Sequence, residues 1–326
     1  MEPINWGIIG CGDVTEVKSG PAFNNVPGSA LVAVMRRDAG KAADYARRHN
    51  VPTWYTDADA LINDPAVNAV YIATPPDSHA DYTIRALRAG KPVYVEKPMA
   101  LNAVECGAMN RISRETGVPL FVAFYRRALP YFLKVKELVD GGVIGPIRHV
   151  SCQLNWPPAD RELGLATQAN WRVTPAISGG GLFHDLAAHQ FDFLEFLLGP
   201  IQTARGFAHN QAGLYEADDM VVAAFTFASG VMGTGSWCFT VNPEQRLEQT
   251  TLVGARGTLT FSFFENFVIT LNTRAGTETL TVPFPDHVQQ PLIESVVAAL
   301  QGRGTCPSTG ETGLRASLIL DWITAG

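Results

Sequence analysis

Short apolar strands alternate with helical patterns through about the first 120 residues, and this alternation most limits what the chain can fold into. The strands are expected at 5–9, 30–34, 69–73, 92–95 and 120–123. The helical patterns lie between them, at 39–49, 57–63, 78–89 and 102–116. Such alternation is typical of a parallel sheet covered by helices. We therefore predict an α/β fold that begins with a doubly wound parallel sheet over residues 1–123.

The rhythm changes after residue 123, where strand-like runs become dominant. These runs lie at 147–155, 203–208, 219–228, 231–239, 249–253, 257–261 and 267–271. Helical patterns recur at 131–138, at 183–197 and near the C-terminus. Short turns between the runs favour a large, mainly antiparallel sheet. We therefore predict a C-terminal α+β domain over residues 124–326, whose closing helix either stays in that domain or packs back on the first one.

Composition excludes several classes of function. The net charge is -6, from 25 basic and 31 acidic residues, and the densest basic groups are pairs, so no nucleic acid is expected as a partner. No run of about 18 apolar residues occurs, and no basic region precedes an apolar N-terminal segment, so no membrane span or signal peptide is expected. The five cysteines are widely spaced. This usage favours a reduced, cytoplasmic protein without a cysteine metal site.

A glycine-rich turn follows the first predicted strand. Gly10 and Gly12 stand where a Rossmann domain makes its tight turn and lets the backbone approach a pyrophosphate, and Asp13 and Val14 should open the next helix. The third glycine of the fingerprint is replaced by Thr15. Two glycines alone also suit an ordinary tight turn, but their position after the first strand favours a dinucleotide site.

The end of the second predicted strand bears on the choice of dinucleotide. An NAD site usually carries an acid there for the ribose 2′-hydroxyl, whereas this strand ends at Met35 and continues with Arg36 and Arg37. Guanidinium groups suit a 2′-phosphate. Two alternatives stay open: the arginines form a solvated loop, or Asp38 turns toward the ribose. We predict NADP as the cofactor, with NAD as the alternative.

Two further strand ends carry polar and rigid residues. After the strand at 69–73 come Thr74, Pro75, Pro76 and His79, and the prolines stiffen this loop because they restrict φ. Ligands of doubly wound folds bind outside the carboxyl ends of the strands. We therefore predict these four residues at the cofactor site, although His79 alone also reads as an ordinary helix-start residue.

The strand at 92–95 ends in Glu96, Lys97 and Pro98, an unusual place for a lysine. Its position at the same sheet edge would bring Lys97 to the nicotinamide end of a cofactor. Pro98 biases the backbone of Lys97 toward an extended conformation, which gives the lysine side chain a defined direction. The alternative is a surface ion pair that ends a strand, which contributes little. Whether the Lys97–Pro98 bond is cis is left open.

A second group of polar residues lies on the predicted helix at 183–197. Asp185 and His189 are four residues apart and share one helical face, and three glycines at 179–181 precede them. By spacing alone, a structural pair and a catalytic pair are equally compatible with this pattern. Metal binding is a third option, but no other cluster with ligand spacing accompanies the two residues.

These motifs together resemble the glucose-fructose oxidoreductase/inositol dehydrogenase (Gfo/Idh/MocA) family. The resembling segments are Gly-Cys-Gly at 10–12, ATPPDSH at 73–79, VEKPMA at 95–100, the Trp-Arg to Asp-x-x-x-His segment at 170–192 and the closing helix at 308–322. They cover nearly the whole chain. The absence of the third glycine is the one departure, and it bears on packing around the pyrophosphate.

The resemblance implies an NAD(P)-dependent oxidoreductase that acts on a sugar, polyol or related cyclic alcohol or ketone. It implies that Lys97, Asp185 and His189 surround the reacting carbon, and that Arg172 and Glu96 lie near the cofactor. A histidine suits the removal of a hydroxyl proton, and a lysine stabilises negative charge on the oxygen. The second domain would bind substrate and pair its sheet into a homodimer or homotetramer.

Two alternatives remain from the sequence. The family includes redox-neutral glycosidases that hold NAD tightly, but Arg36 and Arg37 favour NADP. A regulator that binds a dinucleotide without turnover belongs to a different class. Such a protein has no need of Lys97, Asp185 and His189 together, so the enzyme is preferred.

Overall fold

A computed structural model describes residues 3–164 and 170–325. Two compact units are distinguished by the contacts within them. The first contains residues 1–129 together with 284–315, and the second contains residues 130–283 together with 316–326. Across the described residues, no helix has the length and apolarity needed to cross a bilayer.

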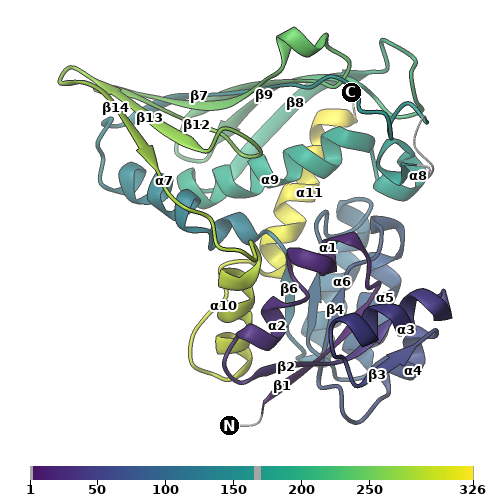
Figure 1. Ribbon diagram of the computed structural model, residues 1–326. Helices are drawn as coiled ribbons and strands as arrows, with labels where there is room; N and C mark the ends of the chain where they lie inside the picture. The colour runs from purple at the N-terminus through teal and green to yellow at the C-terminus, as the bar shows by residue number, and fades with distance from the viewer. Residues whose placement is uncertain (1–2, 165–169, 326) are drawn as a thin grey trace. The chain divides into compact units, whose positions relative to one another are not determined.

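The first unit is built on a six-stranded parallel sheet (Figure 1). Its strands are β1 (Ile4–Ile9), β2 (Ser29–Met35), β3 (Thr53–Tyr55), β4 (Ala69–Ile72), β5 (Val93–Val95) and β6 (Leu120–Val122). The order across the sheet is β3-β2-β1-β4-β5-β6, so the order reverses between β1 and β4. This confirms the predicted doubly wound sheet. The three-residue strand β3, whose Trp54 is exposed, was not predicted.

Helices connect these strands, and side chains cap several of them. The helices are α1 (Asp13–Val17), α2 (Ala22–Asn25), α3 (Ala39–Arg48), α4 (Ala58–Ile62), α5 (His79–Arg88) and α6 (Ala103–Thr116). Asp57 accepts a hydrogen bond from the Ala60 amide at 2.9 Å, and Asn102 accepts one from the Glu105 amide at 3.0 Å. Both residues are therefore N-caps, because each satisfies an amide that has no partner inside its helix.

Aromatic side chains form a core against this sheet, and a segment from near the C-terminus packs into the same core. The rings of Trp6 and Phe23 lie 4.9 Å apart, and those of Tyr71 and Tyr94 stack at 5.1 Å. Helix α10 (Gln290–Leu300) adds buried apolar side chains to the same cluster, among them Leu292, Ile293, Val296 and Val297. Residues close to the C-terminus therefore complete the core of the N-terminal unit. The next helix, α11 (Gly310–Thr324), begins in the first unit and ends in the second.

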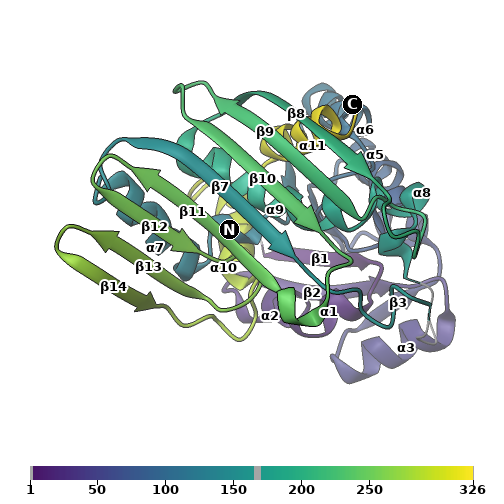
Figure 2. The ribbon, with the colours of Figure 1, turned by 90° about the horizontal axis from the view of Figure 1, so that it is seen from above.

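The second unit contains an eight-stranded sheet in the order β14-β13-β12-β11-β7-β10-β9-β8 (Figure 2). The strands are β7 (Ile147–Asn155), β8 (Ile201–His209), β9 (Met220–Phe227), β10 (Met232–Cys238), β11 (Leu247–Gly254), β12 (Gly257–Phe261), β13 (Val268–Thr273) and β14 (Gly276–Thr281). Only the pair β7–β10 is parallel. The mainly antiparallel sheet is thereby confirmed. The polar edge strand β14 was not predicted.

Helices α7 (Pro130–Asp140) and α9 (Gly181–Leu198) cover one face of this sheet (Figure 1). Aromatic side chains join α9 to the strands: Phe191 lies 5.6 Å from Trp237 of β10, and Phe193 lies 6.1 Å from Phe261 of β12. Trp237 is fully buried, and its indole N–H donates to Gln190 Oε1 at 2.6 Å. This packing holds α9, the helix that carries Asp185 and His189, against the sheet.

Replacing Trp237 with alanine tests how much this packing contributes. We expect Trp237→Ala to lower the free energy of unfolding by about 3–5 kcal/mol, because it empties a core site and leaves Gln190 without its donor. Denaturant unfolding followed by circular dichroism measures the change. Trp54→Ala is the matched control, since Trp54 is 44% exposed, and a shift within about 0.5 kcal/mol is expected there. Equal losses in the two variants would contradict the assignment.

Candidate active site

The glycine-rich turn lies where the order of strands reverses, between β1 and β4. Gly10 has a φ of 93°, which favours glycine, and a Cβ there would come within 2.9 Å of the Thr74 amide nitrogen. Gly12 differs, because a Cβ there would meet nothing closer than Gly10 O at 3.9 Å. The protein itself thus leaves room beside Gly12, as close approach of a pyrophosphate requires.

Helix α1 follows the turn and is only five residues long. Asp13 and Val14 open it, as predicted, and Asp13 is exposed. Thr15, which replaces the third glycine, is fully buried, and its hydroxyl donates to Gly12 O at 2.7 Å. Tyr45 of α3 donates its hydroxyl to Thr15 O at 2.9 Å. The protein therefore accommodates the threonine, whose hydroxyl links the first turn of α1 to the glycine-rich turn.

The loop after β2 holds its two arginines and its aspartate in different ways. Arg36 is partly buried and donates from Nη1 to Cys11 O at 3.1 Å, so its guanidinium lies against the glycine-rich turn. Arg37 is exposed. Asp38 is the N-cap of α3 and accepts from the Lys41 amide at 3.0 Å, a bond that lowers the pKa of its carboxyl. Asp38 is thus already used in capping a helix.

His79 joins the two loops that follow β4 and β5. It is fully buried, and its ring nitrogens lie 2.8 Å from Thr74 O and 2.9 Å from Pro98 O. Burial lowers the pKa of His79, while the two carbonyl oxygens act in the opposite direction. In the loop after β4, Pro75 precedes a 3-10 turn that begins at Pro76. The predicted residue His79 therefore holds the loops together from inside the protein.

A buried hydrogen-bond network surrounds the carboxylate of Glu96. Oε1 of Glu96 accepts from the hydroxyl of Tyr71 at 2.6 Å and from the side-chain amide of Gln289 at 2.6 Å. Tyr94 in turn donates to Gln289 Oε1 at 2.8 Å. Glu96 is only 7% exposed, so the alternative of a surface ion pair is excluded. This carboxylate fixes the end of β5 within its own unit.

Lys97 follows directly at the carboxyl end of β5. Its backbone N–H donates to Glu96 Oε2 at 3.2 Å, and the Lys97–Pro98 peptide bond is cis. The lysine side chain is partly buried, whereas Pro98 and Met99 after it are buried. The backbone of Lys97 is thus held by its neighbours on both sides. Strand β5 pairs with β4, which forms one side of the strand-order reversal.

In the second unit, Asp185 and His189 lie on α9, as their spacing predicts. Asp185 Oδ2 accepts from Arg172 Nε at 3.2 Å, and the guanidinium of Arg172 lies 4.4 Å from the ring centre of Trp171. His189 is buried, with its ring 6.1 Å from that of Phe264. Both predicted residues are therefore held by specific neighbours, and Arg172, predicted at the cofactor, is the ion-pair partner of Asp185.

His184, next to Asp185 in the sequence, has a different environment. Its Nδ1 lies 3.1 Å from Gly180 O, and burial lowers the pKa of its ring to about 4. A Cβ at Gly180 would lie 2.1 Å from this ring, so glycine is required for the close packing. His184 is consequently neutral at physiological pH and serves in packing at the start of α9.

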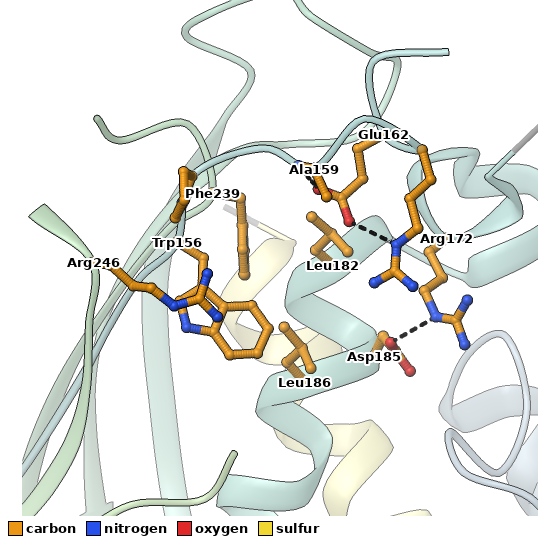
Figure 3. A pocket seen from close by; sticks show the side chains of 11 residues that line it. Trp156, Ala159, Glu162, Arg172, Leu182, Asp185, Leu186, Phe239 and Arg246 are labelled. Atoms are coloured by element: carbon orange, nitrogen blue, oxygen red, sulfur yellow. Dashed lines mark hydrogen bonds and ion pairs between the residues drawn. The ribbon is translucent and has the colours of Figure 1, made fainter. Parts of the chain in front are cut away.

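A pocket of about 140 Å³ opens beside α9 (Figure 3). Leu182, Asp185 and Leu186 face it from successive turns of the helix, and Phe239 adds a further apolar side chain. Its charged and aromatic lining includes Trp156, Arg161, Glu162, Arg172, Asp185 and Arg246. Within residues 3–164 and 170–325, no three His, Cys, Asp or Glu side chains gather as metal ligands.

Several of these residues carry no recognisable motif. Trp156 donates from its indole nitrogen to Glu265 Oε1 at 3.3 Å, and the guanidinium of Arg246 lies 5.0 Å from the tryptophan ring centre. Arg246 and Glu265 also form an ion pair at 2.9 Å. These residues come from β7's end, a loop and the β12–β13 connection. Only the fold brings them together.

The sheet order and the glycine turn define a dinucleotide-binding protein of the Rossmann class. Comparison with known proteins extends this result. Residues 4–124 match an oxidoreductase family with an NAD-binding Rossmann fold, and residues 132–260 match the GFO/IDH/MocA C-terminal domain. The chain belongs to the Gfo/Idh/MocA family, and it is an NAD(P)-dependent oxidoreductase. The recognition made from the motifs is confirmed.

Three relatives illustrate the match. Oxidoreductase P35 of Formosa agariphila is 42% identical over 98% of this chain and 97% of its own. A scyllo-inositol 2-dehydrogenase (NAD(+)) of Bacillus subtilis is 27% identical over 95% of this chain and 87% of its own. A levoglucosan dehydrogenase, solved in complex with NADH and levoglucosan, superimposes with a TM-score of 0.87 at 22% identity, over 99% of this chain and 96% of its own.

Gly12→Ala tests the dinucleotide turn with little effect on folding. The φ of -128° at Gly12 suits alanine, and the new Cβ would meet no protein atom closer than 3.9 Å. The methyl group would, however, occupy the space needed for a pyrophosphate. We expect the Kd for NADP or NADPH, measured by isothermal titration, to rise about tenfold or more at an unchanged Tm. An unchanged Kd would contradict the role of this turn.

Proposed function

We propose that this protein transfers hydride between NADP and a hydroxyl-bearing carbon of a sugar, polyol or related cyclic alcohol or ketone. The observation that carries the proposal is Lys97, held at the carboxyl end of β5 next to the buried carboxylate of Glu96. Family membership supports the reaction class. The names of a scyllo-inositol dehydrogenase and a levoglucosan dehydrogenase among the relatives support the substrate class.

The proposed roles follow from the chemistry of oxidising an alcohol. The hydroxyl proton must leave as the C–H hydrogen departs with its electron pair, and the bound nicotinamide supplies the acceptor for that hydride. His189 takes the hydroxyl proton, because a neutral imidazole is a suitable general base. Lys97 stabilises negative charge on the same oxygen. Asp185, held by Arg172, orients the substrate hydroxyls.

The residues after β2 support NADP over NAD. Arg36 lies against the glycine-rich turn, and Asp38 is engaged as a helix cap. A guanidinium at this position suits a 2′-phosphate, whereas the acid that an NAD site uses for the ribose is absent from the strand tip. A homodimeric or homotetrameric assembly and a cytoplasmic location stay predictions.

Lys97→Ala tests the proposed catalytic role. We expect kcat to fall about 10²–10³-fold while the Kd for the cofactor stays within a factor of about 3, because the lysine acts on the reacting oxygen. Absorbance of the reduced nicotinamide, followed with a panel of sugars and polyols, measures kcat. Lys134→Ala is the control, since the ammonium of Lys134 pairs with the exposed Glu137 within α7.

Two results would count against this role. A Lys97→Ala enzyme with near-normal kcat would contradict it directly. A wild-type protein that binds cofactor but turns over no alcohol or ketone would instead support the redox-neutral glycosidase or the regulator.

Arg36→Asp tests the cofactor preference. We expect the ratio of kcat/KM for NADP to that for NAD to fall about 10–100-fold, because the change removes a charge-assisted partner of the 2′-phosphate and adds repulsion. Arg88→Asp, at the exposed end of α5, is the control and should leave the ratio unchanged. An unaltered ratio in a folded Arg36→Asp enzyme would refute the NADP assignment.

A further inference from the structure

We propose that the pocket beside α9 selects uncharged polyhydroxy compounds over the corresponding acids, and that the ion pair between Arg246 and Glu265 determines this selectivity. The inference rests on the proposed function, since it assigns the chemical class of the substrate. It concerns only the second unit, where all residues of the pocket lie.

Each arginine that lines the described pocket has a carboxylate partner. Arg161 lies 3.4 Å from Glu162, and Arg172 lies 3.2 Å from Asp185. The third pair joins Arg246 and Glu265 at 2.9 Å. Three guanidinium groups are therefore balanced by three carboxylates, and two of these carboxylates, those of Glu162 and Asp185, line the pocket themselves.

This balance affects neutral and anionic ligands differently. A substrate carboxylate would add a negative charge beside Glu162 and Asp185, or it would have to displace one of them from its arginine. Like charges brought together at a binding site are unfavourable. A hydroxyl group, by contrast, donates to a carboxylate and accepts from a guanidinium without disturbing the pair. A ligand rich in hydroxyls thus satisfies both members of each pair.

Arg246 differs from the other two arginines, because its carboxylate partner Glu265 does not itself line the pocket. Its guanidinium lies 5.0 Å from the ring centre of Trp156 and donates from Nε to Glu265 Oε2, in the β12–β13 connection, at 2.9 Å. The indole of Trp156 donates to the same Glu265 at 3.3 Å. Glu265 is therefore the partner of both the guanidinium and the indole, and Figure 3 shows the side chains of Trp156 and Arg246 next to each other.

The buried carboxylate of Glu248 holds the β12–β13 connection, which carries Glu265. Glu248 Oε2 accepts from the backbone amides of Phe263 at 2.8 Å and Phe264 at 3.1 Å. The ring of Phe264 lies 5.5 Å from that of Trp156 and 6.1 Å from that of His189. These contacts hold the backbone just before Glu265, and glutamine has nearly the shape of glutamate, so Glu265→Gln alters charge more than shape.

Glu265→Gln is the decisive variant. Its amide oxygen keeps an acceptor for the Trp156 indole, but the variant removes the charge that balances Arg246. We expect the ratio of the affinity for a neutral polyhydroxy ligand to the affinity for the corresponding acid to fall about tenfold. Glu278→Gln, at an exposed site on β14, is the matched control and should leave the ratio unchanged. A role confined to stability would weaken both ligands equally.

Isothermal titration of the NADP-loaded protein measures the affinities for three matched pairs: D-glucose and D-glucuronate, D-galactose and D-galacturonate, and ribitol and D-ribonate. We expect the wild type to bind the neutral member of at least one pair about tenfold more tightly than the acid. Tighter binding of the acids, binding of no neutral member, or an unchanged ratio in Glu265→Gln would each overturn the inference. The absorbance of reduced nicotinamide, recorded in parallel, separates the two proposals. Selective binding of neutral ligands without turnover would contradict the proposed function and leave the inference standing.

Discussion

The buried carboxylate of Glu96 is the constraint on which the architecture of the first unit depends. Taking a carboxylate out of water costs several kcal/mol unless hydrogen bonds replace the lost hydration. Tyr71 from β4 and Gln289 from the C-terminal segment supply those bonds. The requirement links two neighbouring strands to a segment 193 residues away. The bond from Gln289 thus joins the apolar side chains of α10 in holding the C-terminal segment to the first unit.

Much of this arrangement could be predicted from the sequence, because local patterns report local structure. Alternating strands and helices predicted the parallel sheet, and the spacing of Asp185 and His189 placed both on one helix. The two missed strands, Thr53–Tyr55 and Gly276–Thr281, are short or polar edge strands. Edge strands bury little apolar surface, so they leave no hydrophobic pattern to detect.

The remaining parts of the site depend on contacts between distant residues. Nothing near Gln289 indicates that it bonds to Glu96, and nothing near Glu265 indicates that it holds Trp156 and Arg246. Sequence reasoning also read His79 as a cofactor contact, a role that stays a prediction, whereas its observed bonds join the carbonyls of Thr74 and Pro98. The type of a residue predicts which interactions it can form, but only the fold determines which residue is its partner.

The proposed preference for NADP over NAD depends in the same way on one carboxylate, that of Asp38. Asp38 is the first acid after β2, and a dinucleotide site for NAD would use such a group for the ribose hydroxyls. Here its oxygen accepts from the Lys41 amide and caps α3. Turning Asp38 toward a ribose would break that cap and bring the acid close to Arg36. A 2′-phosphate needs no such rearrangement, because Arg36 is already held beside the turn by Cys11 O. On the proposed NADP assignment, the cap of α3 and the choice of cofactor depend on the same carboxylate.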